Sequence, residues 1–208
     1  MKIFVICQKY RTPDNNPALS TLSINKEVEV APFYTLPDTA LTRPGRPFFV
    51  PDYAVPCTLQ LHVVVRIGRL GKGIPERFAH RYVDGVTLGI VFSADNLLKT
   101  CRENGWPWEV ATGFDGAACL GEMLPPESAT AQSAEFRLEV NGNAVQCGRL
   151  ENLPRPIPRL IADLSRFYTL RQGDLIYTGC AGGPLQAEIN SQLTGWLNSQ
   201  EVMSFKVK

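Results

Sequence analysis

The stretch LQLHVVVRI, Leu59–Ile67, alternates in the manner of a β-strand with two unlike faces. One face is wholly apolar and carries Leu59, Leu61, Val63, Val65 and Ile67. The opposite face holds three polar side chains, Gln60, His62 and Arg66, together with Val64. A polar strand face either meets water or lines a pocket, so the question for this chain is what the second face of this strand contacts.

Strand patterns dominate the rest of the chain. Further strands are predicted at residues 2–6, within 28–37, at 86–93, at 136–140 with a return strand from 145, at 173–179 and at 202–208. Helices are predicted only at 74–85, 93–105 and 157–170. Because regular alternation of strand and helix is missing, the pattern predicts a mostly β (α+β) fold and argues against a doubly wound parallel sheet.

Local signals mark where these elements begin and end. Ser93 is placed to cap the second helix, and Gly105 to end it. Asn141-Gly142 predicts a tight hairpin turn, and Pro44-Gly45 predicts another turn. Residues 11–23, rich in Pro, Asn, Asp and Ser, are expected to form a loop.

The composition indicates an ordinary globular protein. The 208 residues are 44% hydrophobic and 20% charged, with a net charge of +1, and they fit one domain over 1–208. No basic run favours nucleic acid, no stretch is long enough for a membrane span, and the apolar start is too short for a signal peptide. We therefore expect a cytoplasmic protein whose partners include neither nucleic acid nor a membrane.

Common catalytic and metal motifs are missing. The sequence contains no phosphate-binding loop, no dinucleotide fingerprint and no G-x-S-x-G, and GRLGKG at 68–73 is interpreted as a turn. The six cysteines are scattered without metal-binding or disulfide spacing, which is typical of free thiols. With only His62 and His80 available, a His-rich metal site is excluded.

Several blocks nevertheless resemble one family in order and spacing. They are LPDTALTRPGRPFFVPDY, VVVRIGRLGKGIPERFAHRYVDGVTLGI, NGWPWEVATGFDGAACLGE, VNGNAVQCG and GDLIYTG. Together they resemble the fumarylacetoacetate hydrolase (FAH) family nearly end to end. The resemblance implies a mixed β-roll or distorted β-sandwich, a homodimer, a divergent lid-like segment at 1–35 and a core at 36–208.

The resemblance also implies what the polar strand face once held. In the family this strand carries Glu-x-Glu, which binds a divalent cation together with an Asp from a later strand, and the cation polarises a 2-oxo-acid substrate. The matching positions here are Gln60, His62 and Val91. We therefore predict that the magnesium or manganese site is lost and that the protein has no metal cofactor.

Other positions that match the family are changed or kept. Thr112 stands where the family has an active-site lysine, and Pro13 and Asn16 stand where a His-Glu dyad activates water. Matching positions are retained at Tyr10, Asp115, Gln146 and Thr178. The predicted vestigial metal and substrate pocket comprises Tyr10, Gln60, His62, Val91, Thr112, Asp115, Gln146 and Thr178.

Three functions remain open on these residues. The main prediction is a catalytically inactive pseudoenzyme with a binding or assembly role, which takes a small-molecule ligand. The alternative is an active hydrolase, decarboxylase or isomerase of 2-oxo acids, with His62 as general base or holding a softer metal with Gln60 and either Asp95 or Cys119. A third hypothesis is a silent subunit that pairs with an active family member.

Overall fold

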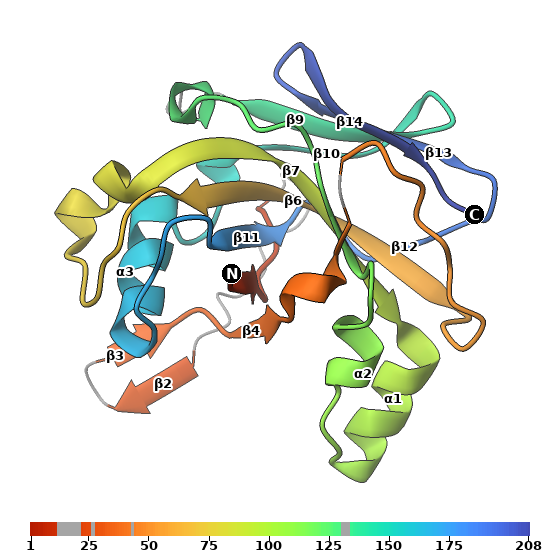
Figure 1. Ribbon diagram of the computed structural model, residues 1–208, viewed down its shortest axis with the longest axis horizontal. Helices are drawn as coiled ribbons and strands as arrows, with labels where there is room; N and C mark the ends of the chain where they lie inside the picture. Colours follow the sequence, from red (N-terminus) through yellow and green to blue (C-terminus); the bar gives the residue numbers. More distant parts are fainter. Residues whose placement is uncertain (12–21, 26–27, 43, 130–133) are drawn as a thin grey trace.

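Two long strands form the centre of the molecule. The computed structural model describes residues 1–11, 22–25, 28–42, 44–129 and 134–208. Strand β6 (Cys57–Ile67) pairs antiparallel with β7 (Val83–Ala94) over almost its whole length. Figure 1 shows the two strands curving together across the molecule. The β-branched run Val63–Val65 favours this extended conformation, and all three of its side chains are buried.

The large sheet built on these strands is mixed. Its order is β4 (Phe33–Leu36), β1 (Ile3–Ile6), β11 (Leu175–Cys180), β6, β7, β8 (Ala118–Leu120) and β5 (Leu41–Thr42), and β12 (Leu185–Gln186) also pairs with β6. β1 runs parallel to β11, whereas β11 runs antiparallel to β6. This curved mixed sheet confirms the predicted mostly β fold and is not doubly wound.

A second sheet packs against the first. It contains β10 (Asn143–Arg149), β9 (Glu135–Val140), β13 (Gln192–Leu197) and β14 (Gln200–Lys206), and β13 and β14 contact β7 (Figure 1). The predicted β9–β10 turn is confirmed, because Asn141 and Gly142 both have positive φ, 51° and 83°. A small separate sheet pairs β2 (Leu22–Asn25) with β3 (Val28–Val30).

Helices lie at two places around the large sheet. α1 (Asp95–Asn104) follows β7 directly and packs against α2 (Glu109–Thr112), and Gly105 at φ 66° ends α1 as predicted. α3 (Ile157–Phe167) buries Leu160, Ile161 and Leu164. Short 3₁₀ turns are η1 (Asp38–Ala40), η2 (Glu76–Tyr82), η3 (Pro126–Ala129) and η4 (Leu150–Asn152). Over the described ranges, no helix is long and apolar enough to cross a bilayer.

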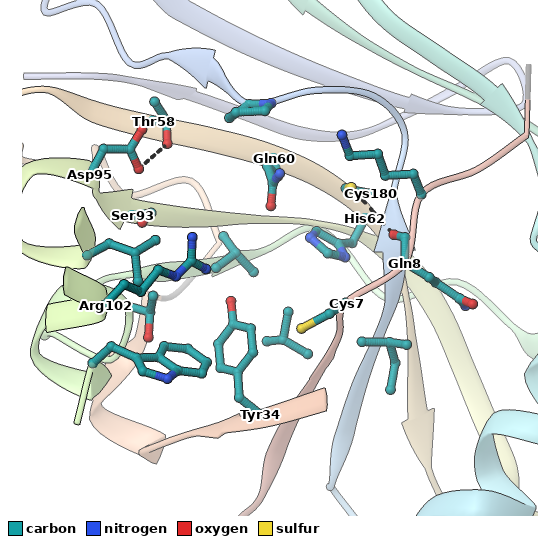
Figure 2. A pocket seen from close by; sticks show the side chains of 18 of the residues that line it. Cys7, Gln8, Tyr34, Thr58, Gln60, His62, Ser93, Asp95, Arg102 and Cys180 are labelled. Atoms are coloured by element: carbon teal, nitrogen blue, oxygen red, sulfur yellow. Dashed lines mark hydrogen bonds between the residues drawn. The ribbon is translucent and has the colours of Figure 1, made fainter. Parts of the chain in front are cut away.

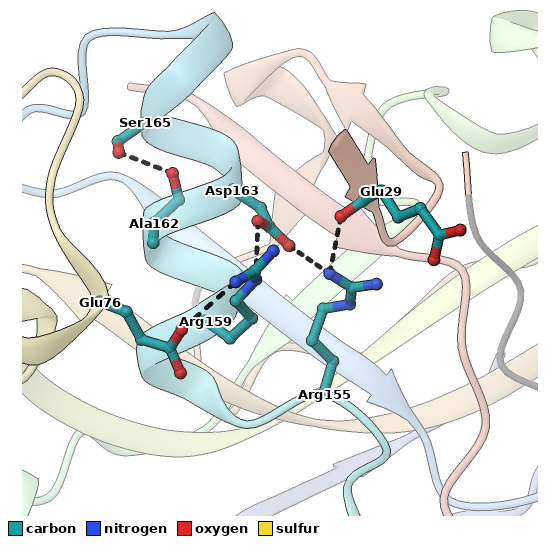
Figure 3. Close-up of polar contacts among 7 residues, drawn as sticks. All are labelled: Glu29, Glu76, Arg155, Arg159, Ala162, Asp163 and Ser165. Carbon is teal, nitrogen blue, oxygen red and sulfur yellow. Dashed lines mark hydrogen bonds and ion pairs between the residues drawn. The ribbon is translucent and has the colours of Figure 1, made fainter. Parts of the chain in front are cut away.

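An ion-pair network fixes α3 against its neighbours (Figure 3). The buried Asp163 carboxylate accepts a hydrogen bond from Arg155 Nη1 at 2.8 Å, and Arg159 Nε lies 3.1 Å from its other oxygen as an ion-pair contact. Arg155 also donates to the Glu29 carbonyl of β3, and Arg159 reaches Glu76 of η2 at 3.5 Å. One carboxylate therefore connects α3 to two segments that are distant in the sequence.

Some local predictions need correction. The helix predicted at 74–85 is the 3₁₀ helix η2, and β7 begins at Val83 instead of residue 86. The predicted loop at 11–23 ends inside β2, and its residues 12–21 lie outside the described part of the chain. The short strands β5, β8 and β12 and the whole of β13 were not predicted.

Candidate functional site

A cavity of about 920 Å³ opens beside the polar face of β6 (Figure 2). Its wall is built from β6 and β7, the end of β1 with residues 7–9, Tyr34 of β4, and the helices α1 and α2. Cys180 at the end of β11 and Pro154 and Pro184 complete the lining. The cavity thus collects side chains from both ends of the sequence.

The register of β6 and β7 explains how the polar face is assembled. The directly opposed pairs are Thr58 with Ser93, Gln60 with Val91, and His62 with Gly89. Opposed residues of an antiparallel pair share one face, so these side chains gather on the cavity side. His62 is only 2% exposed, so it is enclosed and does not face open water. Arg66, at the far end of the same face, pairs with Asp84 at 2.7 Å instead.

Several buried polar atoms that line this cavity have no hydrogen-bond partner in the described chain. They are Nδ1 and Nε2 of His62, Oγ of Ser93 and Oγ1 of Thr112. Buried polar groups in proteins are almost always hydrogen-bonded, since an unpaired one costs about 1–3 kcal/mol. A set of unpaired donors and acceptors around one cavity is therefore the arrangement expected for a site that pairs them with a polar ligand.

His62 is held neutral by its surroundings. Burial lowers the pKa of His62 to about 3, because removing the imidazole from water disfavours its charged form. The ring packs edge-on against Tyr177, with centroids 5.7 Å apart. A neutral imidazole carries one donor and one acceptor nitrogen, so His62 can donate and accept a hydrogen bond at the same time.

One face of α1 supplies most of the charged lining, and Lys9, after β1, adds a further cation. The residues on this face are Asp95, Leu98, Lys99, Arg102 and Glu103, spaced as one side of a helix requires. The Asp95 carboxylate accepts from the Thr58 hydroxyl at 2.9 Å, and Lys99 lies 3.8 Å from Glu103. Arg102 has no ion-pair partner within the described ranges, which leaves its guanidinium available to a ligand.

The predicted pocket residues separate into two groups. Gln60, His62, Val91 and Thr112 line the cavity. The other four do not: the Tyr10 hydroxyl lies 3.2 Å from Thr178 Oγ1, which donates to the Val63 carbonyl, and both side chains are buried behind the cavity wall. Gln146 accepts from the backbone N–H of Leu61 and donates to the Gly183 carbonyl, and Asp115 is exposed.

Ser93 is a correction to the predicted helix cap. β7 continues to Ala94, which occupies the N-cap position of α1, and no side chain caps this helix. Ser93 is therefore a strand residue whose hydroxyl faces the cavity. Neither Ser93 nor Arg102 was predicted as a site residue, although the helical spacing from Asp95 to Arg102 offered a signal for a second polar face.

The residues present do not fit a hard divalent cation. Magnesium prefers several anionic oxygen ligands. The three positions that match the cation ligands of the resembling family carry the amide of Gln60, the neutral imidazole of His62 and the methyl groups of Val91. A softer site is not assembled either: Asp95 bonds Thr58, and the Cys119 sulfur lies 3.5 Å from that of Met203. Over the part of the chain that is described, no three His, Cys, Asp or Glu side chains converge. Pro13 and Asn16 lie outside the described residues.

Comparison with known proteins identifies the family. The model of the fumarylacetoacetate (FAA) hydrolase C-terminal family matches residues 3–208 of this chain. The chain belongs to the fumarylacetoacetate hydrolase family. The resemblance noted in the sequence is thereby confirmed, and with it the mixed β architecture that the resemblance implied.

Individual FAH-family members are similar over most of their length. Oxaloacetate tautomerase FAHD1, mitochondrial, from Mus musculus is 31% identical over 173 residues, covering 83% of this chain and 78% of that protein. Fumarylpyruvate hydrolase from Ralstonia sp is 29% identical over 160 residues, covering 77% of this chain and 83% of that protein. A crystal structure of an FAH-family protein from Yersinia pestis CO92 superposes with a TM-score of 0.85 at 27% identity, covering 100% of this chain and 93% of that one.

Proposed function

We propose that this chain is an FAH-family enzyme that moves a proton on a small 2-oxo acid, converting its enol to its keto form, at a site rebuilt around His62. The observation that carries the proposal is the set of buried polar atoms that line one cavity without a hydrogen-bond partner in the described chain, among them both nitrogens of His62. The cavity volume of about 920 Å³ is ample for a small carboxylate.

The proposed reaction matches what these residues can do. Tautomerisation breaks the enol O–H bond and forms a C–H bond, so it consumes neither water nor an oxidant. A neutral imidazole accepts the enol proton at one nitrogen, and the imidazolium returns a proton to carbon. A bound carboxylate or enolate raises the pKa of His62 from its low value, because a nearby negative charge favours the imidazolium. Gln60, beside His62 on the cavity face, is placed to hydrogen-bond the substrate oxygen.

Hydrolysis of a C–C bond makes a larger demand on the site. It needs a base that activates water, and the positions resembling the family's water-activating dyad hold Pro13 and Asn16. Proton transfer alone needs one base and an enclosed pocket. The similarity to a relative named as an oxaloacetate tautomerase supports the same choice.

The catalytically inactive pseudoenzyme is the second candidate, and one observation favours it. The three positions that resemble the family's cation-binding carboxylates hold Gln60, His62 and Val91, so the attraction that a divalent cation exerts on a substrate is missing from this donor set. The same cavity then serves to bind a ligand without transforming it. A silent subunit paired with an active family member is a variant of this candidate.

Enol absorbance separates the two candidates. The purified chain is mixed with freshly dissolved oxaloacetate in buffer containing EDTA, and the decay of the enol band is followed with wild type, His62→Gln and the exposed control His80→Gln. We expect acceleration by wild type and His80→Gln, and a loss of about 10²- to 10⁴-fold in His62→Gln, the usual contribution of a general base. Equal rates for wild type and buffer, with or without added magnesium, would favour the pseudoenzyme.

A further inference from the structure

Arg102, an exposed residue of α1, reaches the cavity and has no ion-pair partner among the residues that the structure describes. Figure 2 shows its side chain reaching toward the region where the Ser93 and Tyr34 hydroxyls lie. The neighbouring charges on α1 are engaged: Asp95 with Thr58, and Lys99 with Glu103. Burial raises the pKa of the Tyr34 hydroxyl, and the guanidinium of Arg102 opposes that shift, as expected of a positive charge close to the phenol.

Four groups on this side of the cavity can donate hydrogen bonds, beside the carboxylates of Asp95, which accepts from Thr58, and Glu103, which lies 3.8 Å from Lys99. Arginine has donors and no acceptor, and the Ser93 and Thr112 hydroxyls are buried without a partner in the described chain. Tyr34 is kept in its protonated form by burial, so it also donates. An ionised carboxylate is its natural complement, because it only accepts hydrogen bonds and pairs with a guanidinium through two parallel bonds.

The placement of these donors relative to His62 is also informative. Ser93 stands opposite Thr58 on the β6–β7 pair, and two residues further along each strand lie Gln60 and Val91, followed by His62 and Gly89. Thr112 ends α2, which packs against both α1 and β7. Ser93 and His62 therefore lie along one cavity wall with the Gln60–Val91 pair between them, about 13 Å apart along the strands. Arg102, Thr112 and Tyr34 reach the same cavity from α1, α2 and β4.

We propose that Arg102 is the specificity-determining residue of this site: it binds a carboxylate of the substrate, with the Ser93 and Thr112 hydroxyls as further donors, and it supplies the positive charge that makes binding independent of a divalent cation. The inference deepens the proposed function, on which it rests for the identity of the substrate class. The ligand is thus a small carboxylate whose reacting carbon lies toward His62.

Titration calorimetry with oxalate tests the assignment. Oxalate is a planar carboxylate that does not tautomerise, and EDTA removes divalent cations. The variants are Arg102→Gln, Arg102→Lys, Ser93→Ala and the control Arg69→Gln, which removes the same charge from an exposed residue outside the cavity lining. Wild type and Arg69→Gln should bind alike. Arg102→Gln should bind oxalate about 10- to 100-fold more weakly. Arg102→Lys should have an intermediate affinity, because lysine keeps the positive charge but cannot form the two parallel hydrogen bonds of a guanidinium.

Several outcomes would overturn the inference. It fails if wild type does not bind oxalate, if Arg102→Gln binds as wild type does, or if inorganic phosphate binds more tightly than oxalate. Ser93→Ala should weaken oxalate binding without lowering the melting temperature, because its hydroxyl has no partner in the described chain. A melting temperature that falls in step with affinity would indicate a structural role.

The inference and the proposed function fail in different ways. If oxalate binding depends on Arg102 but the chain does not accelerate enol decay, the assignment of Arg102 as the carboxylate-binding residue stands and the proposed tautomerase activity is refuted. If the chain accelerates enol decay and the KM is the same in Arg102→Gln as in wild type, the proposed activity stands and the role of Arg102 in binding the carboxylate is refuted. If both are right, Arg102→Gln raises KM, whereas His62→Gln lowers kcat and still binds oxalate.

Discussion

Burial of the His62 imidazole lowers the stability of the fold and at the same time leaves both ring nitrogens free to bind a ligand in the cavity. The imidazole is enclosed, neutral and without a hydrogen-bond partner on either nitrogen in the described chain. Natural proteins retain such groups where function offsets the loss of stability. Replacing a buried unpaired polar group with an apolar one of similar size is neutral or stabilising, so stability alone gives no reason for a histidine here.

The acid sensitivity of the fold is expected to reflect this residue. The pKa of His62 is about 3 in the folded chain and 6.5 when unperturbed, so the unfolded chain binds the extra proton between these values. Burial of His62 therefore adds no proton-linked destabilisation above pH 6.5, and it destabilises the folded chain progressively as the pH falls from 6.5 toward 3. Between pH 6 and 4.5, wild type should lose about 2 kcal/mol more than His62→Leu.

Urea denaturation at a series of pH values measures this difference. His80→Leu serves as the matched control, because His80 is the other histidine of the chain and is exposed. Parallel pH profiles for wild type and His62→Leu would refute the expected burial of a neutral imidazole.

The metal-binding geometry is expected to survive the loss of its carboxylates. Gln60 stands opposite Val91, and His62 follows Gln60 on the same strand face, so three carboxylates placed there would converge. The triple variant Gln60→Glu, His62→Glu and Val91→Asp should bind manganese or magnesium in calorimetry, whereas wild type should not. A folded triple variant that binds neither metal would show that the cavity has rearranged.

Strand alternation was sufficient to predict part of the site. Period-two counting placed Gln60 and His62 together, and the family resemblance added Val91 and Thr112, all of which line the cavity. Ser93 was misassigned because a serine before a helical pattern is also a good cap. Arg102 was missed because the direction of a helix face depends on how the helix packs against the sheet, which local sequence does not specify.

At the level of elements, strong periodic patterns were predictable and interrupted ones were not. α3 shows a clear apolar stripe and formed where expected. β13 carries Gly195 in its middle, where an added Cβ would lie 2.8 Å from Cε of the flexible Met203 side chain. Glycine weakens a strand pattern, so this residue concealed the strand from the sequence.

The network around α3 should be sensitive to loss of its central charge. Asp163→Asn leaves the buried Arg155 without its ionic partner, and breaking a buried pair typically costs about 3–5 kcal/mol. Glu76→Gln is the matched control, because its contact with Arg159 is exposed and should contribute less than about 1 kcal/mol. Chemical denaturation compares the two, and equal effects would mean that the Asp163 pair is not a stabilising link.

For the whole molecule, the family resemblance predicts a homodimer. Phe49, Tyr53 and Val55 lie close together in the sequence and are 51–63% exposed, an apolar surface of the kind that subunit contacts cover. Sedimentation equilibrium should give twice the 23.0 kDa chain mass. Phe49→Glu should weaken association, whereas Leu70→Glu, on an exposed leucine distant from these residues in the sequence, should not. A monomeric wild type would refute the expectation.

The fold class was predictable from composition and strand pattern, but the order of strands was not. β1 inserts between β4 and β11, and its parallel partner lies at residues 175–177. Nothing in IFVI specifies that partner, since many apolar strands of this chain offer equivalent edges. Such long-range pairing is decided by the sum of contacts in the assembled sheet.

The same pairing sets the order of events during synthesis. Residues 3–6 leave the ribosome long before residues 175–180, so β1 cannot reach its parallel neighbour until those residues have been synthesised. Contacts of such large sequence separation slow folding, because loop closure precedes any gain from pairing. The cavity is lined by residues at and after the end of β1 and by Cys180, so it cannot form before residue 180 has been synthesised. A ligand of this cavity therefore cannot serve as a template for the earlier folding steps.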